Sequence, residues 1–138
     1  MNKKKIIFAV FAAFVVMFVL SGLWHMVILG DFYTSNDVAL ARTEVNMLPV
    51  VLGVFILTFL MAVIYPSVYK GGSPLKEGFR FGAVIGIIWA LPMQLVFHGI
   101  WNYPLSGVLV DSAWHIVEQG LGGIVIAYIF GTGKQNKK

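Results

Sequence analysis

Four apolar runs, each long enough to cross a membrane as a helix, constrain this sequence more than any other feature. They cover residues 6–29, 47–69, 79–101 and 109–130. At ~1.5 Å per helical residue the first run reaches roughly 36 Å, which exceeds a hydrocarbon thickness of about 30 Å. Only 12% of the residues are charged, whereas soluble domains carry about 25%. The sequence therefore predicts an all-α polytopic membrane protein, a four-transmembrane-helix bundle that forms a single membrane domain over residues 1–138.

The basic start of the chain would also suit a cleaved signal peptide. The apolar run that follows Lys5 is too long for one, however, and no small-residue cleavage pattern follows a short apolar core. We therefore expect the first helix to be retained. The chain has no cysteine, which excludes disulfides, thiolate metal ligands and lipid attachment through cysteine.

Basic residues are distributed unevenly among the segments that flank the four runs. Lysines gather at both termini, and Lys70, Lys76 and Arg80 lie around the second connection. The first connection has only Arg42, and the third has no basic residue. By the positive-inside rule, both termini and the second connection lie in the cytoplasm. Orientation in a lipid bilayer thus explains the net charge of +4, and no nucleic-acid partner is expected. The first connection, residues 31–46, is polar and long enough for a short surface helix.

Small residues recur at every fourth position in the third run and again in the fourth run. Such stripes let helix backbones approach closely in lipid, where apolar burial no longer drives association. Their spacing favours packing of these two helices within one bundle over a dimerisation face. The helix-packing residues are Gly78, Gly82, Gly86, Gly123, Ala127 and Gly131.

All three histidines of the chain are expected at one depth near the outer surface. His25 lies four residues inside the end of the first run, His98 five residues before Tyr103, and His115 four residues after Asp111. Each is therefore roughly 6–8 Å below the surface. The sequence predicts a polar layer in the outer half of the bundle.

Other polar residues extend this layer, and most of them also have a plain structural explanation. Gln94 lies one turn from His98 and could simply bridge helices. His25 could anchor its helix at the interface, and His98 could donate to a backbone carbonyl. Asp111 is expected at the water interface, as a cap of the fourth helix. Glu118, about two turns inside the span, must be protonated, paired or ligating.

Together these residues predict an outward-facing polar pocket with one of three chemistries. Imidazoles and carboxylates suit zinc, iron or manganese, and His98, His115 and Glu118 are the candidate metal ligands. Two imidazoles at matched depth could instead ligate a haem or a chlorophyll-type pigment. His115 and Glu118 would also suit a proton relay. The candidate ligand-binding residues are His25, Gln94, His98, His115 and Glu118.

Three segments resemble those of small uncharacterised bacterial four-span inner-membrane proteins. They are Gly-Leu-Trp-His at residues 22–25, the segment from Tyr69 to Gly82, and Trp-His-Ile-Val-Glu at residues 114–118. The resemblance implies a multi-pass protein of the bacterial inner (cytoplasmic) membrane. It implies no activity and no catalytic residue.

A binding role follows from these features more readily than catalysis, because four helices with short connections leave little room for a separate soluble active site. We expect a metal, pigment or small ligand in the pocket, in an accessory subunit of a larger membrane complex or in a homo-oligomer. The alternatives are an intramembrane enzyme that uses a metal or the His115/Glu118 pair, a small oligomeric transporter, and a purely structural subunit.

Overall fold

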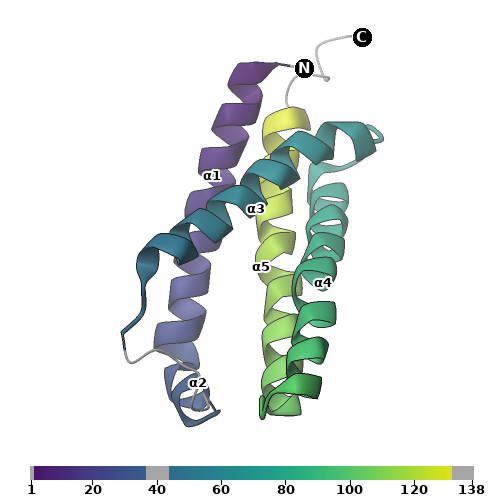
Figure 1. The fold of residues 1–138 in the computed structure, drawn as a ribbon. Helices are drawn as coiled ribbons and strands as arrows, with labels where there is room; N and C mark the ends of the chain where they lie inside the picture. The colour runs from purple at the N-terminus through teal and green to yellow at the C-terminus, as the bar shows by residue number, and fades with distance from the viewer. Residues whose placement is uncertain (1, 37–43, 132–138) are drawn as a thin grey trace.

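The computed structural model describes residues 2–36 and 44–131, and its described secondary structure is entirely helical (Figure 1). Within the described residues, four helices are long and apolar enough to cross a membrane. This confirms the prediction of an all-α bundle with four long apolar helices. The elements are α1 (Lys3–Gly22), the π-helical turn η1 (Leu23–Ile28), α2 (Gly30–Asn36), α3 (Met47–Val68), α4 (Pro74–Ile100) and α5 (Leu105–Gly131).

Helices α4 and α5 both begin earlier than the apolar runs predict. α4 starts at Pro74, since proline suits the first helical position, where its missing N–H is not needed. Its first turn carries Lys76 and Glu77, so hydropathy detects only the later, apolar part. α5 starts at Leu105, directly after Pro104. Asp111 therefore lies within α5, and the expectation that it caps this helix was wrong.

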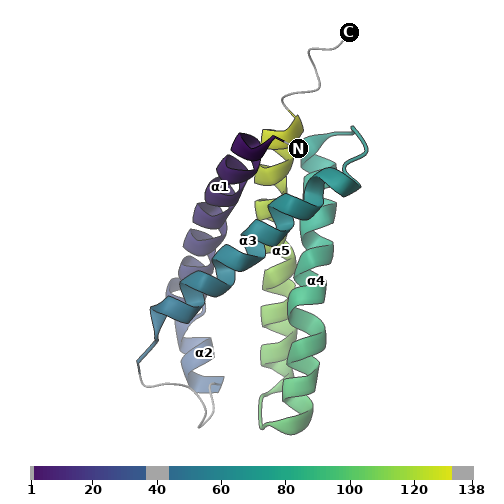
Figure 2. The same ribbon diagram turned by 45° about the horizontal axis from the view of Figure 1, so that its top comes forward.

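The helices pack around α5, which lies between α1 and α4 (Figures 1 and 2). α4 and α5 are antiparallel neighbours along most of their length. α3 crosses this layer obliquely: its last turns lie near the start of α4, while its first turns diverge from α4. The first residues of α3 are accordingly exposed, with Leu48 at 66%. One side of the bundle is thus only partly covered.

The glycines of α4 allow the close contact between α4 and α5. A Cβ atom added at Gly78 would lie 2.6 Å from the carbonyl oxygen of Gly123 and 2.7 Å from the Ala127 Cβ. Added at Gly82 or Gly86, it would overlap the backbone of Gln119 or His115, respectively. The structure thus brings the two small-residue stripes into contact within one chain, apart from Gly131. A Cβ atom at Gly131 would instead meet Pro74.

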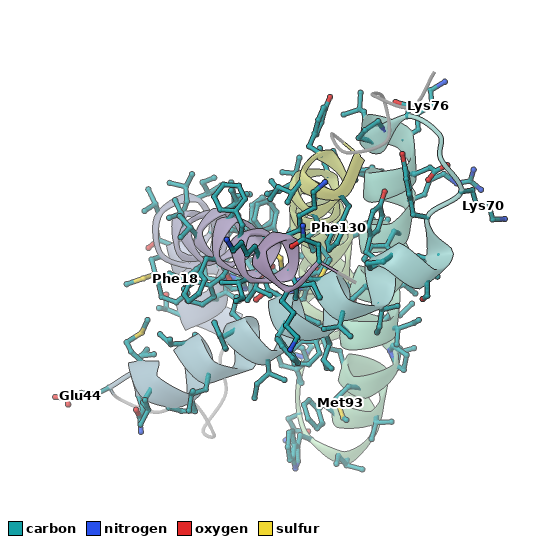
Figure 3. The ribbon with its side chains drawn as sticks, turned by 90° about the horizontal axis from the view of Figure 1, so that it is seen from above. Phe18, Glu44, Lys70, Lys76, Met93 and Phe130 are labelled. Atoms are coloured by element: carbon teal, nitrogen blue, oxygen red, sulfur yellow. The ribbon has the colours of Figure 1, made fainter. Side chains whose placement is uncertain are left out.

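The exterior of the bundle is apolar and its interior is partly polar. Exposed side chains include Phe8 at 65% and Ile88 at 65%, whereas Glu118 and Gln119 are each 1% exposed. Figure 3 shows carbon-rich side chains projecting outward from the peripheral helices, with Met93 among them. This distribution is the reverse of that in a soluble bundle and suits a lipid environment.

The two ends of the bundle differ in charge. The terminal end, as we name it, holds the start of α1, the end of α5 and the α3–α4 loop, and it carries all described lysines and arginines. Lys70 and Lys76 project from it in Figure 3. In the loop, Glu77 accepts hydrogen bonds from the backbone N–H groups of Lys70 (3.2 Å) and Gly72 (2.8 Å).

The opposite end, named the α2 end, holds α2 and the α4–α5 connection. The short surface helix expected within residues 31–46 is present as α2, and positions 37–43 lie outside the described residues.

Candidate functional site

Asp111 is the centre of a polar cluster that joins η1, α2, α4 and α5. The Nε2 atom of His25 lies 3.0 Å from its Oδ1, and the Tyr33 hydroxyl donates to the same oxygen at 2.9 Å. The Gln94 amide donates to Oδ2, and His115 Nε2 lies 3.4 Å from that oxygen. One carboxylate thus connects side chains from four segments of the chain.

The π-helical turn η1 positions His25 and Trp24. Its wider turn is visible in the hydrogen bond from Leu29 N–H to the Trp24 carbonyl, five residues earlier, at 2.9 Å. The carbonyl of Ser21 is left to accept from His25 Nδ1 at 2.9 Å. Single π-turns within helices are frequent at functional sites.

A stacked tryptophan pair holds this end of α1 against α5. The rings of Trp24 and Trp114 are nearly parallel, with centroids 4.3 Å apart. Trp24 Nε1 donates to the Tyr33 hydroxyl at 3.1 Å, and that hydroxyl donates to Asp111. Burial, together with the neighbouring Asp111 carboxylate, raises the pKa of Tyr33 above its ordinary value. The hydroxyl therefore keeps the proton that it donates.

His115 connects Asp111 to a second carboxylate deeper in the bundle. Its Nδ1 atom lies 3.0 Å from Glu118 Oε2 and 3.4 Å from the amide nitrogen of Gln119. Both nitrogens of His25 and both of His115 face oxygen acceptors. If all four ring nitrogens donate to these oxygens, both rings are doubly protonated, their two charges balance the two carboxylates, and the Gln119 amide must turn its oxygen toward His115 Nδ1. The cluster can be neutral overall, which suits a site surrounded by lipid.

The cluster unites most, but not all, of the residues expected in the site. His25, Gln94, His115 and Glu118 are brought together around Asp111. His98 is not: its side chain is exposed, and Nδ1 lies 2.6 Å from the Tyr103 carbonyl oxygen. It joins the end of α4 to the short connection that follows.

Sequence reasoning missed Tyr33 and Gln119 and took Asp111 for a cap. The i, i+4 spacing of Asp111 and His115 was the available signal for Asp111, since it puts both on one helix face. Nothing in the polar connection distinguishes Tyr33 from its neighbours, and Gln119 follows Glu118 without a motif of its own.

The donor set does not fit a metal ion or a haem. Among the described residues, no group of three or more His, Cys, Asp or Glu side chains is arranged to hold a metal ion. The rings of His25 and His115 have centroids 6.5 Å apart, and the Nε2 atoms of both face Asp111. A flat macrocycle between the two rings would have to displace that carboxylate.

Beside the cluster lies a cavity of about 360 Å³, bounded by α1, η1, α3, α4 and α5. Its floor includes His115, Glu118 and Gln119, and Gln119 Oε1 is buried without a hydrogen-bond partner in the described part of the chain. Its walls are mostly apolar. They include Met17, Pro49, Val50, Gly53, Val54, Leu57 and Trp89.

An apolar exterior, four helices of membrane-spanning length and a buried polar cluster define a multi-pass integral membrane protein. The chain belongs to the family described as "Predicted membrane protein (DUF2177)", whose sequence model matches residues 6–128. The match thus reaches into all four long helices. No curated protein and no solved structure matches the chain.

Proposed function

We propose that this membrane protein binds a small organic molecule in the cavity beside the Asp111 cluster. The observation that carries the proposal is the Gln119 side chain, which is 1% exposed, lines the cavity and has an Oε1 atom without a partner in the described chain. An unpaired buried amide costs about 1–3 kcal/mol, which a hydrogen bond to a ligand would recover. The volume of about 360 Å³ lies within the range of small-molecule sites.

The shape of the site supports an organic ligand rather than a metal ion. Apolar walls with a few convergent polar groups are typical of small-molecule pockets. The imidazoles of His25 and His115, which would be ligands of a zinc or iron ion, face carboxylate and carbonyl oxygens instead. Asp111, His25 and Tyr33 serve to hold His115 and Glu118 in place.

In this proposal the protein lies in the bacterial inner (cytoplasmic) membrane with its α2 end outside. All described lysines and arginines lie at the terminal end, and the positive-inside rule puts such an end in the cytoplasm. The polar cluster and the cavity then lie toward the outer leaflet.

Filling the cavity tests the proposal. Gly53 lines it, and a Cβ atom added there meets no atom within 4 Å, so Gly53→Phe can place its ring in the cavity without a backbone clash. Gly99→Phe is the matched control, because Gly99 has equally open surroundings and does not line the cavity. Full-length protein and both variants are purified from membranes, extracted with organic solvent and compared by mass spectrometry.

We expect a near-stoichiometric small molecule from the natural protein and from Gly99→Phe, and its loss from Gly53→Phe. Release of the same molecule by both variants, or of none by the natural protein, would contradict the proposal. A purely structural subunit predicts no released molecule. An accessory subunit predicts co-purifying proteins that neither substitution removes.

A further inference from the structure

The mouth of the cavity lies between α3 and α4. Val50 and Trp89 line the cavity and are 43% and 50% exposed, whereas Leu57 and Gln119 line it and are 8% and 1% exposed. The exposed members form the rim and the buried members the floor. The oblique course of α3 separates its first turns from α4 (Figures 1 and 2).

The rim lies at the depth of lipid acyl chains. Trp89 is eleven residues before Ile100, the end of α4, which corresponds to ~17 Å along the helix and about half a hydrocarbon core. On the same helix, Ile88 and Met93 are 65% and 53% exposed. Apolar exposed side chains at this depth face lipid, so a molecule dissolved in the bilayer can reach the mouth sideways.

The floor specifies the polar group that such a molecule needs. The Glu118 carboxylate accepts hydrogen bonds. Whichever way the Gln119 amide is turned, one of its two heteroatoms faces His115 and the other needs a partner. A hydroxyl group has one proton to donate, so it can donate to the Glu118 carboxylate and accept from the Gln119 amide nitrogen, when the amide oxygen is turned toward His115 Nδ1–H. A carbonyl group cannot donate to Glu118.

We infer that the ligand is a long-chain alcohol that enters from the bilayer between α3 and α4 and places its hydroxyl group against Glu118 and Gln119. This inference rests on the proposed function and names its ligand class. Its chain lies along Val50, Val54 and Trp89, and its uncharged head avoids the cost of burying a further charge.

Photo-crosslinking in lipid nanodiscs tests the ligand class. The probe is hexadecanol with a diazirine in mid-chain, and the matched control probe is its methyl ether, which cannot donate. With full-length protein, we expect the alcohol to label peptides of α3 and α4 at the cavity, with competition by excess unlabelled hexadecanol. The ether should label these peptides about tenfold less, since it leaves a buried polar group unpaired.

Three variants connect the labelling to the cavity. Glu118→Gln, which keeps the shape of the side chain, and Gln119→Leu should each reduce alcohol labelling to the level of the ether. Gly99→Phe should leave it unchanged. A normal unfolding transition of Glu118→Gln in detergent shows that its loss of labelling is not a loss of fold.

The labelling and the extraction experiments together distinguish a failure of this inference from a failure of the proposed function. Equal labelling by the alcohol and the ether would contradict the inference that the ligand is an alcohol. Uniform labelling of all lipid-facing helices would contradict it as well. If the natural protein releases a small molecule that Gly53→Phe has lost, while the alcohol fails to label the cavity, the proposed function stands and the inference is wrong. If Gly53→Phe releases the same molecule as the natural protein and leaves the alcohol labelling unchanged, both are wrong.

Discussion

Asp111 shows how a bundle with an apolar exterior retains a carboxylate. Side chains of His25, Tyr33, Gln94 and His115 all face its two oxygens, so the charge is solvated by the protein instead of water. Its spacing to His115 was visible in the sequence. Its depth was not, because that depends on where α5 begins, and the run of apolar residues does not mark that point.

Asp111→Ala should destabilise the protein by about 3–5 kcal/mol, because it leaves buried donors without their shared acceptor. Reversible unfolding of the purified variant in mixed detergent micelles measures the loss. Asp31→Ala removes an exposed carboxylate at the same end of the molecule and should change stability by less than about 0.5 kcal/mol. Equal stability of the two variants would show that Asp111 is not the centre of the cluster.

The α4–α5 pair is the element on which the site depends. Gly82 and Gly86 contact the backbones of Gln119 and His115, so the same close packing that joins the helices also fixes two residues of the site. Hydropathy and the glycine spacing were sufficient to predict the four helices and the contact surface of this pair. The π-turn η1 was not predictable, because it depends on contacts that Trp24 and His25 make with distant segments.

Gly82→Val should separate α4 from α5 and destabilise the bundle by about 1–3 kcal/mol, as overpacking does in close-packed interfaces. Sodium dodecyl sulfate titration, followed by tryptophan fluorescence, reports both the unfolding midpoint and the surroundings of the Trp24–Trp114 stack. Gly99→Val is the control, since a Cβ atom there meets nothing within 4 Å. If Gly82→Val were as stable as Gly99→Val, α4 and α5 would have to lie further apart than the structure shows.

At the scale of the whole molecule, the chain lends itself to a direct test of orientation. It has no cysteine, so a single introduced cysteine is the only target for a thiol reagent. Ser73 is exposed in the α3–α4 loop, and Ser106 is exposed at the start of α5, at the opposite end. The two positions therefore report on the two sides of the membrane.

In intact cells, a membrane-impermeant maleimide should label Ser106→Cys and should label Ser73→Cys only after lysis. This follows from the charge difference between the ends, because translocation of lysine-rich segments is disfavoured. Labelling of Ser73→Cys alone in intact cells would show that the protein has the opposite orientation. The cavity would then lie toward the cytoplasmic leaflet. Labelling of neither would indicate that Ser106 is shielded, and Asn102→Cys would then serve in its place.

The oblique course of α3 has a consequence for the surrounding lipid. The apolar runs of α3, α4 and α5 are similar in length, at residues 47–69, 79–101 and 109–130. Because α3 is inclined to α4 and α5, its apolar run covers a shorter distance across the bilayer. Lipids with short acyl chains match the α3 side and longer ones match the α4–α5 side. We therefore expect the membrane around this protein to be thinner on the α3 side, where the cavity opens.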